Sequence, residues 1–400
     1  RLADESVCVG PAQAKQSYLN IPAIITAATI TNVDAIHPGY GFLSENAKFA
    51  KILEEHGFKF IGPRSSHIEL MGNKIQAKKT MAEKKVPIIP GIMNVNDKKQ
   101  ITEFIKEFNF PVIVKASSGG GGKGMKTIFN ESEIENAISL AKKESLNAFN
   151  DDTLYLEKFL KTPKHIEIQV IADQFNNVLH LGERDCSIQR NHQKIIEESP
   201  STILTSAQRE EIGQISVNAV KSIGYEGVGT LEFLFENNKF YFMEMNTRLQ
   251  VEHPVTEMVT GIDLVKEQIK IAAGIKIEYN QNDIKINGHS IECRINAEHP
   301  KTFIPSPGTI KRYHQPGGLG VRVESALFQD YKIPPHYDSM IAKLITYGKN
   351  RQECISKMKK ALEEYVIMGI DSTIQLNQDI LDKDEFISGN YNINFMNTLS

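Results

Sequence analysis

The sequence predicts a multidomain protein that combines α/β and α+β units. The first 85 residues alternate short strands with helices, a pattern typical of a parallel sheet. After residue 164 the chain becomes rich in strands and includes a hairpin with apolar residues on both arms. The length of 400 residues corresponds to about two or three domains. We therefore expect a parallel α/β domain at the N-terminus, followed by α+β units.

The composition is ordinary for a globular protein. Hydrophobic residues make up 40% of the chain and charged residues 24%, and the formal net charge is −3. This charge provides no basic field for nucleic acid, and no apolar run approaches the roughly 18 residues of a membrane span. The four cysteines lie far apart, without metal-binding spacing. We expect free thiols in the cytoplasm, and no nucleic acid or membrane as partner.

The N-terminal region carries a candidate ligand loop. The expected elements are strands at 33–36 and 58–61 and helices at 45–55 and about 73–85. Ser44 can cap the first helix. Tyr40 lies between two glycines just after the first strand, at the edge where open α/β sheets bind ligands. Lys74 lies in the first turn of the second helix, where an isolated lysine is by default solvated.

A glycine loop divides the next region. The expected elements are strands at 111–115, 125–129 and 154–159 and helices at 98–108 and 131–143. Residues 119–124 fit GxGxxG, but Thr127 and Ile128 favour a strand where a dinucleotide fingerprint needs a helix. Met125 stands where a Walker A loop needs lysine. Two alternatives remain: a flap that closes over phosphates with Lys115 beside it, or a flexible surface hairpin.

The strand-rich half is centred on a hairpin in residues 231–253. The elements expected around it are strands at 165–170, 178–181 and 184–194 and helices at 206–223, 261–273 and 351–365, the first helix capped by Thr205. A three-residue loop at 237–239 would place Glu232 opposite Glu244, with Cβ atoms about 4.5–5.5 Å apart. Such a pair calls for a cation. A two-residue loop would instead pair Glu232 with Met243 and put the carboxylates on opposite faces.

The chain alternates polar and apolar residues after the hairpin. If the segment stays extended, one face carries Glu244, Asn246, Arg248, Gln250 and Glu252. A half-buried strand with a solvated face is the simple alternative. The row mixes acid, amide and guanidinium groups, so it suits a metal, an anion clamp and a general base in sequence. Together with the glycine loop and the lysines, it predicts a magnesium–nucleotide site.

These motifs together resemble biotin carboxylase, a family of the ATP-grasp superfamily. The segments that carry the resemblance are HPGYGFLSEN (37–46), MGNK (71–74), VKASSGGGGKGM (114–125), EKFLKTPKHIEIQV (157–170), ERDCSIQRNHQK (183–194), GVGTLEF (227–233), EMNTRLQVEHPVTE (244–257) and ECRINAE (292–298). The resemblance implies an incomplete N-terminal parallel α/β domain (1–85), a lid subdomain with the glycine flap (86–160), an ATP-grasp catalytic domain (161–285) and a C-terminal antiparallel sheet domain (286–400).

The resemblance also implies the site residues. Those for ATP are Lys74, Lys115, Gly121, Gly122, Glu157, Lys158, Phe159, Leu160, His165, Gln189, His192, Glu232 and Glu244. The ligands for Mg²⁺ or Mn²⁺ are Glu232, Glu244 and Asn246. The bicarbonate pocket is Lys194, Arg248, Gln250, Val251 and Glu252, and the biotin contacts are Tyr40, Gly41 and Arg294. The catalytic set is Arg248, Glu252, Lys194 and Arg294.

The implied reaction is ATP-dependent carboxylation of biotin with bicarbonate, through carboxyphosphate. The implied setting is acetyl-CoA carboxylase in fatty acid biosynthesis, with biotin carboxyl carrier protein and carboxyltransferase subunits as partners and a homodimer for the full-length chain. Alternatives are the same domain of a propionyl-CoA, methylcrotonyl-CoA or pyruvate carboxylase, or a non-catalytic nucleotide-binding subunit. Two departures from the family are expected to affect dimer contacts: the absence of its N-terminal strand–helix–strand unit, and Leu319 in place of phenylalanine before Arg322.

Overall fold

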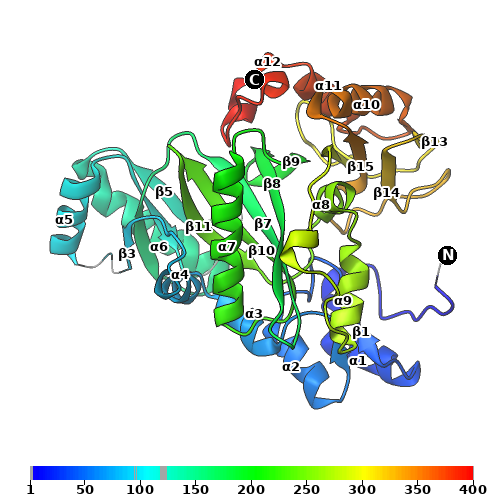
Figure 1. Ribbon diagram of the computed structural model, residues 1–400, viewed down its shortest axis with the longest axis horizontal. Helices are drawn as coiled ribbons and strands as arrows, with labels where there is room; N and C mark the ends of the chain where they lie inside the picture. The colour runs from blue at the N-terminus through cyan, green and yellow to red at the C-terminus, as the bar shows by residue number, and fades with distance from the viewer. Residues whose placement is uncertain (1–2, 94, 96, 118–123, 400) are drawn as a thin grey trace.

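The computed structural model describes residues 3–93, 95, 97–117 and 124–399 (Figure 1). It places an N-terminal α/β unit, a small lid sheet and one large sheet around a central cavity. No helix in these ranges is long and apolar enough to cross a membrane. The described cysteines are all free thiols, as expected.

The N-terminal unit contains the predicted parallel strands. Its elements are β1 (Ala35–Ile36), β2 (Lys59–Phe60), α1 (Ile21–Ile30), α2 (Ala47–Glu55), α3 (Ser65–Gly72) and α4 (Lys74–Glu83). The predicted cap was wrong: Asn46, not Ser44, caps α2 by accepting a hydrogen bond from Phe49 N at 2.8 Å. The backbone N–H of Ser44 closes a turn onto Gly41 O at 3.0 Å, so the helix starts later.

The lid sheet has one apolar face and one face toward the cavity. Its strands, in the order β3-β6-β4-β5, are β3 (Gly91–Ile92), β6 (Leu154–Lys158), β4 (Val112–Ala116) and β5 (Met125–Ile128). Helices α5 (Lys98–Phe108) and α6 (Ile134–Phe149) pack on the face that carries Val112, Val114 and Leu156. Strands β4 and β5 are antiparallel, as the predicted strand–loop–strand requires. Gly121 and Gly122 of the loop lie outside the described residues.

The large sheet has eight antiparallel strands in the order β11-β10-β7-β8-β9-β12-β15-β14. Their bounds are β7 (Lys164–Ala172), β8 (Val178–Arg190), β9 (Gln193–Ser199), β10 (Gly227–Glu236), β11 (Lys239–Asn246), β12 (His289–Asn296), β14 (Val321–Ser325) and β15 (Met340–Gly348). Helix α7 (Ser206–Ser222) lies along one face of β7 and β8 (Figure 1), and Thr205 caps it as predicted. The sheet therefore continues across residue 285, between the third and fourth expected regions.

Two strand predictions in this sheet were wrong. Residues 178–190 form one strand, where we expected two. The expected strand 184–194 is broken because Asn191 and His192 have φ of 49° and 64°, the backbone of a tight turn between β8 and β9. This turn projects His192 toward the cavity, whose lining includes its side chain.

The C-terminal half adds helices to the large sheet. They are α8 (His253–Thr260), α9 (Leu264–Ala272), α10 (Arg351–Glu364), α11 (Ile374–Leu381) and α12 (Asp384–Ser388). The expected helix 261–273 starts at Leu264 instead, because Gly261 (φ 72°) ends α8 and Asp263 caps α9. A hydrophobic core that includes Ile291 and Met358 joins β12 to α10.

The hairpin of β10 and β11 differs from the expected geometry but keeps the expected carboxylate pair. The loop has two residues, Asn237 and Asn238, both with positive φ (52° and 58°), so the three-residue loop was wrong. The register then shifts at a β-bulge, and Glu232 pairs with Glu244 as predicted. Met243 is the extra residue in the bulge.

The polar row does not remain a strand. Strand β11 ends at Asn246, and the backbone N–H of Thr247 donates to the Glu45 carboxylate at 3.0 Å instead of to a neighbouring strand. Residues 247–252 are irregular and lead into α8. The expected extended segment to Glu252 was therefore wrong, although Arg248, Gln250 and Glu252 all line the same cavity as Glu244.

Candidate active site

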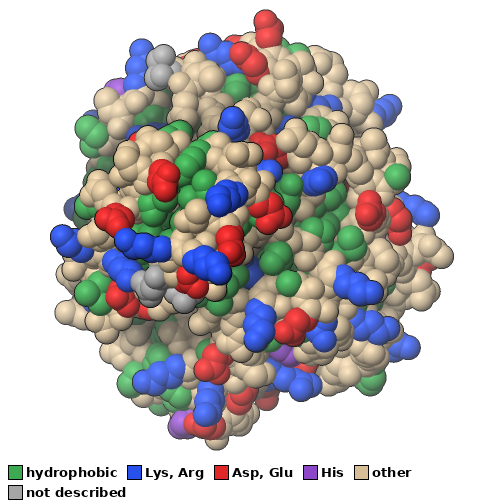
Figure 2. Space-filling model, turned by 90° about the vertical axis from the view of Figure 1, so that its left-hand side faces the viewer, with side chains coloured by type: hydrophobic (Ala, Val, Ile, Leu, Met, Phe, Trp, Pro, Cys, Tyr) green, Lys and Arg blue, Asp and Glu red, His purple; other side chains and the backbone are tan. Residues whose placement is uncertain are grey.

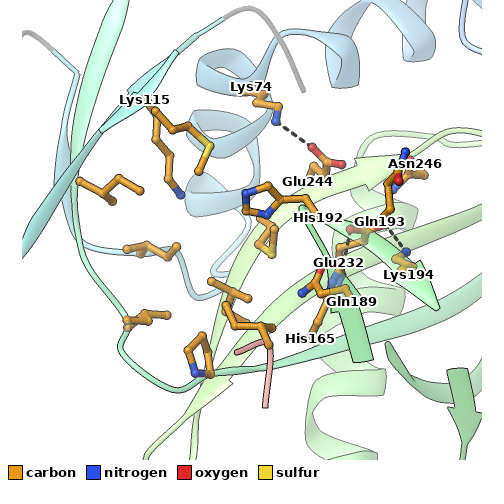
Figure 3. Close-up of a pocket in the computed structure, with 18 of the residues that line it drawn as sticks. Lys74, Lys115, His165, Gln189, His192, Gln193, Lys194, Glu232, Glu244 and Asn246 are labelled. Carbon is orange, nitrogen blue, oxygen red and sulfur yellow. Dashed lines mark hydrogen bonds and ion pairs between the residues drawn. The ribbon is translucent and has the colours of Figure 1, made fainter. Parts of the chain in front are cut away.

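A cavity of about 450 Å³ lies between the lid sheet, α4 and the large sheet (Figure 3). It brings together most of the predicted site residues, namely Lys74, Lys115, Lys158, Phe159, Leu160, His165, Gln189, His192, Lys194, Glu232, Glu244, Asn246, Arg248, Gln250, Val251, Glu252 and Arg294. Glu157 lies beneath Lys115, buried in the lid. The cavity has a lysine-rich end beside α4 and β4 and an ion-paired end near the C-terminal strands.

The lysine-rich end carries the cations expected for phosphates. Lys74 Nζ lies 3.1 Å from Glu244 Oε2, and Lys115 Nζ lies 2.9 Å from Glu157 Oε2. Figure 3 shows both lysines pointing into the cavity from α4 and β4, with His192 between them and the large sheet. Burial, together with the charges of Lys115 and Lys74, lowers the pKa of His192, so its imidazole is neutral at pH 7.

Glu232 is the most highly connected carboxylate of the cavity. Its oxygens accept hydrogen bonds from Asn246 Nδ2 (2.7 Å) and Gln250 Nε2 (2.8 Å) and pair with His165 Nε2 (2.9 Å). Burial alone would raise its pKa, but Lys194 and His165 outweigh burial and hold the pKa of Glu232 well below its usual range. Glu232 is therefore ionised in the folded protein.

The predicted metal ligands fit a divalent cation by donor chemistry and position. Glu232 and Glu244 stand opposite each other on paired strands and line the same cavity, and carboxylates are preferred ligands of Mg²⁺. In this structure Glu244 forms an ion pair with Lys74, and Glu232 accepts a hydrogen bond from Asn246. Asn246 Oδ1 accepts a hydrogen bond from Arg248 Nη2 at 2.9 Å. A bound cation would take the place of Lys74 at Glu244.

The ion-paired end is built around Glu252, of which only 1% is exposed. Lys194 Nζ lies 2.7 Å from Glu252 Oε1, and Arg294 Nη2 lies 2.9 Å from Glu252 Oε2. Burial would raise the pKa of Glu252, but Lys194 and Arg294 hold it well below the usual range. Glu252 thus stays an ionised carboxylate between two cations, able to accept a proton once a ligand separates it from Lys194.

The guanidinium of Arg248 is fixed at the rim by a residue that we did not predict. Arg248 Nε donates to Glu45 Oε2 at 2.8 Å. Glu45 comes from the segment that precedes α2, and the same carboxylate holds the backbone of Thr247. The contact with Glu45 ties the N-terminal unit to Arg248, and its sequence separation of 203 residues leaves no local pattern from which it could be predicted.

Glu167 and Arg184 are further buried groups that the sequence analysis missed. Glu167 pairs with Lys194, and its Oε2 accepts a hydrogen bond from Arg184 Nη2 at 3.1 Å. Burial raises the pKa of Glu167 to about 7, against the opposing charge of Lys194. The two-residue period of β7 places Glu167 on the same face as His165, and this signal could have found it.

Of the described residues that were predicted for the site, Glu157, Tyr40 and Gly41 do not line this cavity. Tyr40 lies in a neighbouring hollow with His253 and Glu324, and Gly41 is exposed, with φ 78°. Lys343 links the two sites: its Nζ lies 5.8 Å from the centre of the Tyr40 ring and donates to Val251 O at 2.7 Å. Burial raises the pKa of Tyr40, so it remains a neutral phenol.

Comparisons with known proteins agree with this arrangement. Family models match the chain as the biotin carboxylase N-terminal domain (residues 1–68), the ATP binding domain of the carbamoyl-phosphate synthase L chain (73–280) and the biotin carboxylase C-terminal domain (292–398). A biotin carboxylase of Allochromatium vinosum is 56% identical over 397 residues, which cover 99% of this chain and 88% of that protein.

Two solved structures share the fold. One is a biotin carboxylase complex with β-γ-ATP from Campylobacter jejuni, with a TM-score of 0.95, 50% identity, and coverage of 99% of this chain and 89% of that chain. The other is the biotin carboxylase domain of the Hydrogenobacter thermophilus 2-oxoglutarate carboxylase with MgADP, ADP and bicarbonate. Its TM-score is 0.90 at 49% identity, and the match covers 95% of this chain and 85% of that chain.

The lid sheet, the lysines and the paired carboxylates over one large sheet define an ATP-grasp ligase. The three matching domains and the identity over nearly the whole chain then place it further: the chain belongs to the biotin carboxylase family. It is an ATP-dependent enzyme that carboxylates biotin.

Proposed function

We propose that the two ends of the cavity divide the reaction between them. ATP lies between the lid and the large sheet, with its phosphates at Lys74 and Lys115 and its base near Lys158, Phe159 and Leu160. Gly121 and Gly122 contribute to phosphate binding, and His165, Gln189 and His192 contact the ribose and phosphates. Mg²⁺ held by Glu232, Glu244 and Asn246 would neutralise phosphate charge as the γ-phosphoryl group is transferred.

Bicarbonate lies at the ion-paired end, between Arg248, Gln250 and Lys194, beside the backbone of Val251. Glu252 takes the bicarbonate proton, and the resulting oxyanion attacks the γ-phosphorus of ATP to give carboxyphosphate and ADP. The observation that carries this assignment is the position of Glu252, ionised and 2.7 Å from Lys194 at the wall of the cavity.

Biotin reacts where Arg294 meets Glu252. Carboxyphosphate breaks down to CO₂ and phosphate, and the phosphate takes the N1′ proton of biotin. Arg294 stabilises the enolate oxygen that forms, and N1′ then attacks CO₂. Tyr40 and Gly41 form the outer side of the biotin site, because the Tyr40 ring lies close to Lys343, which in turn contacts Val251.

The proposed carboxylation of biotin is tested by measuring ADP release from MgATP. We expect release that requires both bicarbonate and free biotin, and a loss of that release in Arg294→Ala. Equal ADP release with and without biotin would contradict the assignment and leave a bicarbonate-dependent ATPase. A non-catalytic nucleotide-binding subunit, the other alternative, predicts no ADP under any of these conditions.

We further infer that the acyl acceptor is acetyl-CoA, which makes this chain the cytoplasmic biotin carboxylase subunit of acetyl-CoA carboxylase, acting with carrier protein and carboxyltransferase. Support comes from the match to the A. vinosum protein named biotin carboxylase, of which this chain spans 88%. Reconstitution with carrier protein and carboxyltransferase should yield malonyl-CoA. Carboxylation only with a pyruvate, propionyl-CoA or methylcrotonyl-CoA carboxyltransferase would overturn this acceptor.

We also propose that the full-length protein is a homodimer. Leu319, which is 93% exposed, lies just before β14, and Arg322 on that strand pairs with Glu257 at 2.7 Å. Support comes from the biotin carboxylase domain of the Hydrogenobacter thermophilus 2-oxoglutarate carboxylase, which is described as a dimer. Sedimentation of the wild-type protein and of Leu319→Asp tests this: both remaining monomeric would contradict it.

A further inference from the structure

A second lysine lies behind Lys115, and it belongs to none of the predicted site residues. Lys78 is on α4, one turn after Lys74, and only 3% of it is exposed. Its ammonium group pairs with Glu157 Oε1 and lies 4.6 Å from the centre of the Tyr155 ring. A buried lysine is costly unless it is paired, and Glu157 supplies the partner of Lys78.

The register of the lid sheet brings the charged groups of Lys115 and Glu157 close together, next to Lys78. Lys115 stands opposite Tyr155, and Glu157 stands opposite Ile113, so all four side chains project from the same face of β4 and β6. Glu157 Oε2 lies 2.9 Å from Lys115 Nζ, while Glu157 Oε1 pairs with Lys78. One carboxylate, itself only 1% exposed, therefore serves two ammonium groups.

The sum of these charges is positive. Lys78 and Lys115 contribute two positive charges, and Glu157 contributes one negative charge. Without Lys78, Glu157 and Lys115 would form a neutral pair, and Lys115 would be held to the lid by the whole charge of the carboxylate. With Lys78 present, one oxygen of the Glu157 carboxylate is already paired, and the three side chains together keep a net charge of plus one beside the cavity.

We propose that Lys78 is a positioning residue that shares the Glu157 carboxylate with Lys115 and so leaves uncompensated positive charge at Lys115 to bind phosphate. This inference rests on the proposed role of Lys115 at the ATP phosphates. The contribution of Lys78 to binding affinity should therefore grow with the negative charge of the ligand and be absent for an uncharged nucleoside.

The test is calorimetric binding of adenosine, AMP and ADP to the full chain and to Lys78→Gln. Glutamine can still donate a hydrogen bond to Glu157 but carries no charge. We expect unchanged affinity for adenosine and roughly tenfold weaker affinity for ADP, with AMP between them, the order of magnitude of one partly screened unit charge. Lys79→Met removes the same charge from the exposed side of α4 and should change none of the three.

A double variant separates positioning from direct contact. Lys78→Met with Glu157→Gln removes both members of the buried pair and leaves Lys115 unpaired. We expect the ratio of its ADP affinity to its adenosine affinity to return to that of the wild type, because any role of Glu157 at the nucleoside would change both affinities equally. If this ratio stayed as low as in Lys78→Gln, Lys78 would contact phosphate itself, and the proposal would be overturned. Equal losses for adenosine and ADP in Lys78→Gln would also overturn it, because they would indicate a general structural defect.

Lys115→Met separates this inference from the proposed site. If Lys115→Met weakens ADP and leaves adenosine unchanged while Lys78→Gln affects neither, the phosphate site stands and only the role of Lys78 fails. If Lys115→Met leaves ADP affinity unchanged, the proposed phosphate site itself fails.

Discussion

At the residue scale, Glu252 is the carboxylate that joins Lys194 and Arg294. Lys194 reaches it from β9 and Arg294 reaches it from β12, at 2.7 and 2.9 Å. Arg294 is in turn fixed by Glu197, whose Oε1 accepts from its Nε at 2.6 Å. The Glu252 carboxylate thus contacts both Lys194, which is proposed to bind bicarbonate, and Arg294, which is proposed to bind biotin. Loss of its charge should disturb both steps without touching the lysines at the nucleotide end.

Glu252→Gln tests this separation. We expect bicarbonate-dependent ADP release to fall by about 10²-fold or more, the usual range for loss of a general base. ADP binding, measured by calorimetry, should stay as in the wild type, because Glu252 has no contact with Lys74 or Lys115. Glu211→Gln, on the exposed side of α7, is the matched control. Full activity in Glu252→Gln would exclude this carboxylate as the base.

At the element scale, the bulge in β11 decides which residues face the cavity. Phe242 and Met245 both pack in the core, while Met243 and Glu244 between them both line the cavity. Strict alternation after Phe242 would have turned Glu244 into the core. The bulge reverses the alternation at Met243 and so keeps both carboxylates on the cavity side.

Deletion of Met243 provides a test of the bulge. The deletion would restore regular alternation, with Phe242 still in the core and Glu244 still opposite Glu232. We expect Mg²⁺-dependent ADP binding to remain within about tenfold of the wild type, because the bulge residue is the unpaired one. Deletion of Met245, which lies outside the bulge, should abolish that binding. The reverse order of effects would contradict the proposed role of the bulge.

The hairpin also shows which features of the fold could be predicted from the sequence. The carboxylate pair was predicted correctly from a loop length that was wrong, because the turn and the bulge shift the register by compensating amounts. Local signals located Thr205 as a cap and bounded α5. The contacts of Glu45 with Arg248 and of Lys78 with Glu157 span 203 and 79 residues, and nothing in the local sequence pairs them.

At the scale of the whole molecule, Glu198 holds the large sheet to the C-terminal helices. It lies on β9 and is fully buried, and it accepts hydrogen bonds from His289 Nε2 and Arg351 Nε, both at 2.6 Å, and from Tyr391. Burial would raise its pKa, but His289 and Arg351 hold the pKa of Glu198 far below its usual range. Its charge therefore stabilises the assembled fold.

Glu198→Gln should destabilise the protein by about 3–5 kcal/mol at pH 7, because Arg351 loses its buried partner. A depressed carboxyl pKa contributes stability above the unfolded value of about 4.3, and this contribution is lost as the pH falls below it. The difference between wild type and variant in denaturant unfolding should therefore shrink between pH 6 and pH 3. Glu363→Gln, on the exposed side of α10, should show no such trend, and a constant difference for Glu198→Gln would refute the linkage.

In the proposed reaction, the carbon of bicarbonate reaches biotin through carboxyphosphate, which is formed with ATP. The most direct measurement is transfer of ¹⁴C from labelled bicarbonate to free biotin by the full chain with MgATP. We predict acid-labile labelled biotin in a one-to-one ratio with ADP, and both products reduced by about 10²-fold or more in Glu252→Gln. ADP formed without labelled biotin, or labelled biotin formed without ATP, would contradict the proposed reaction.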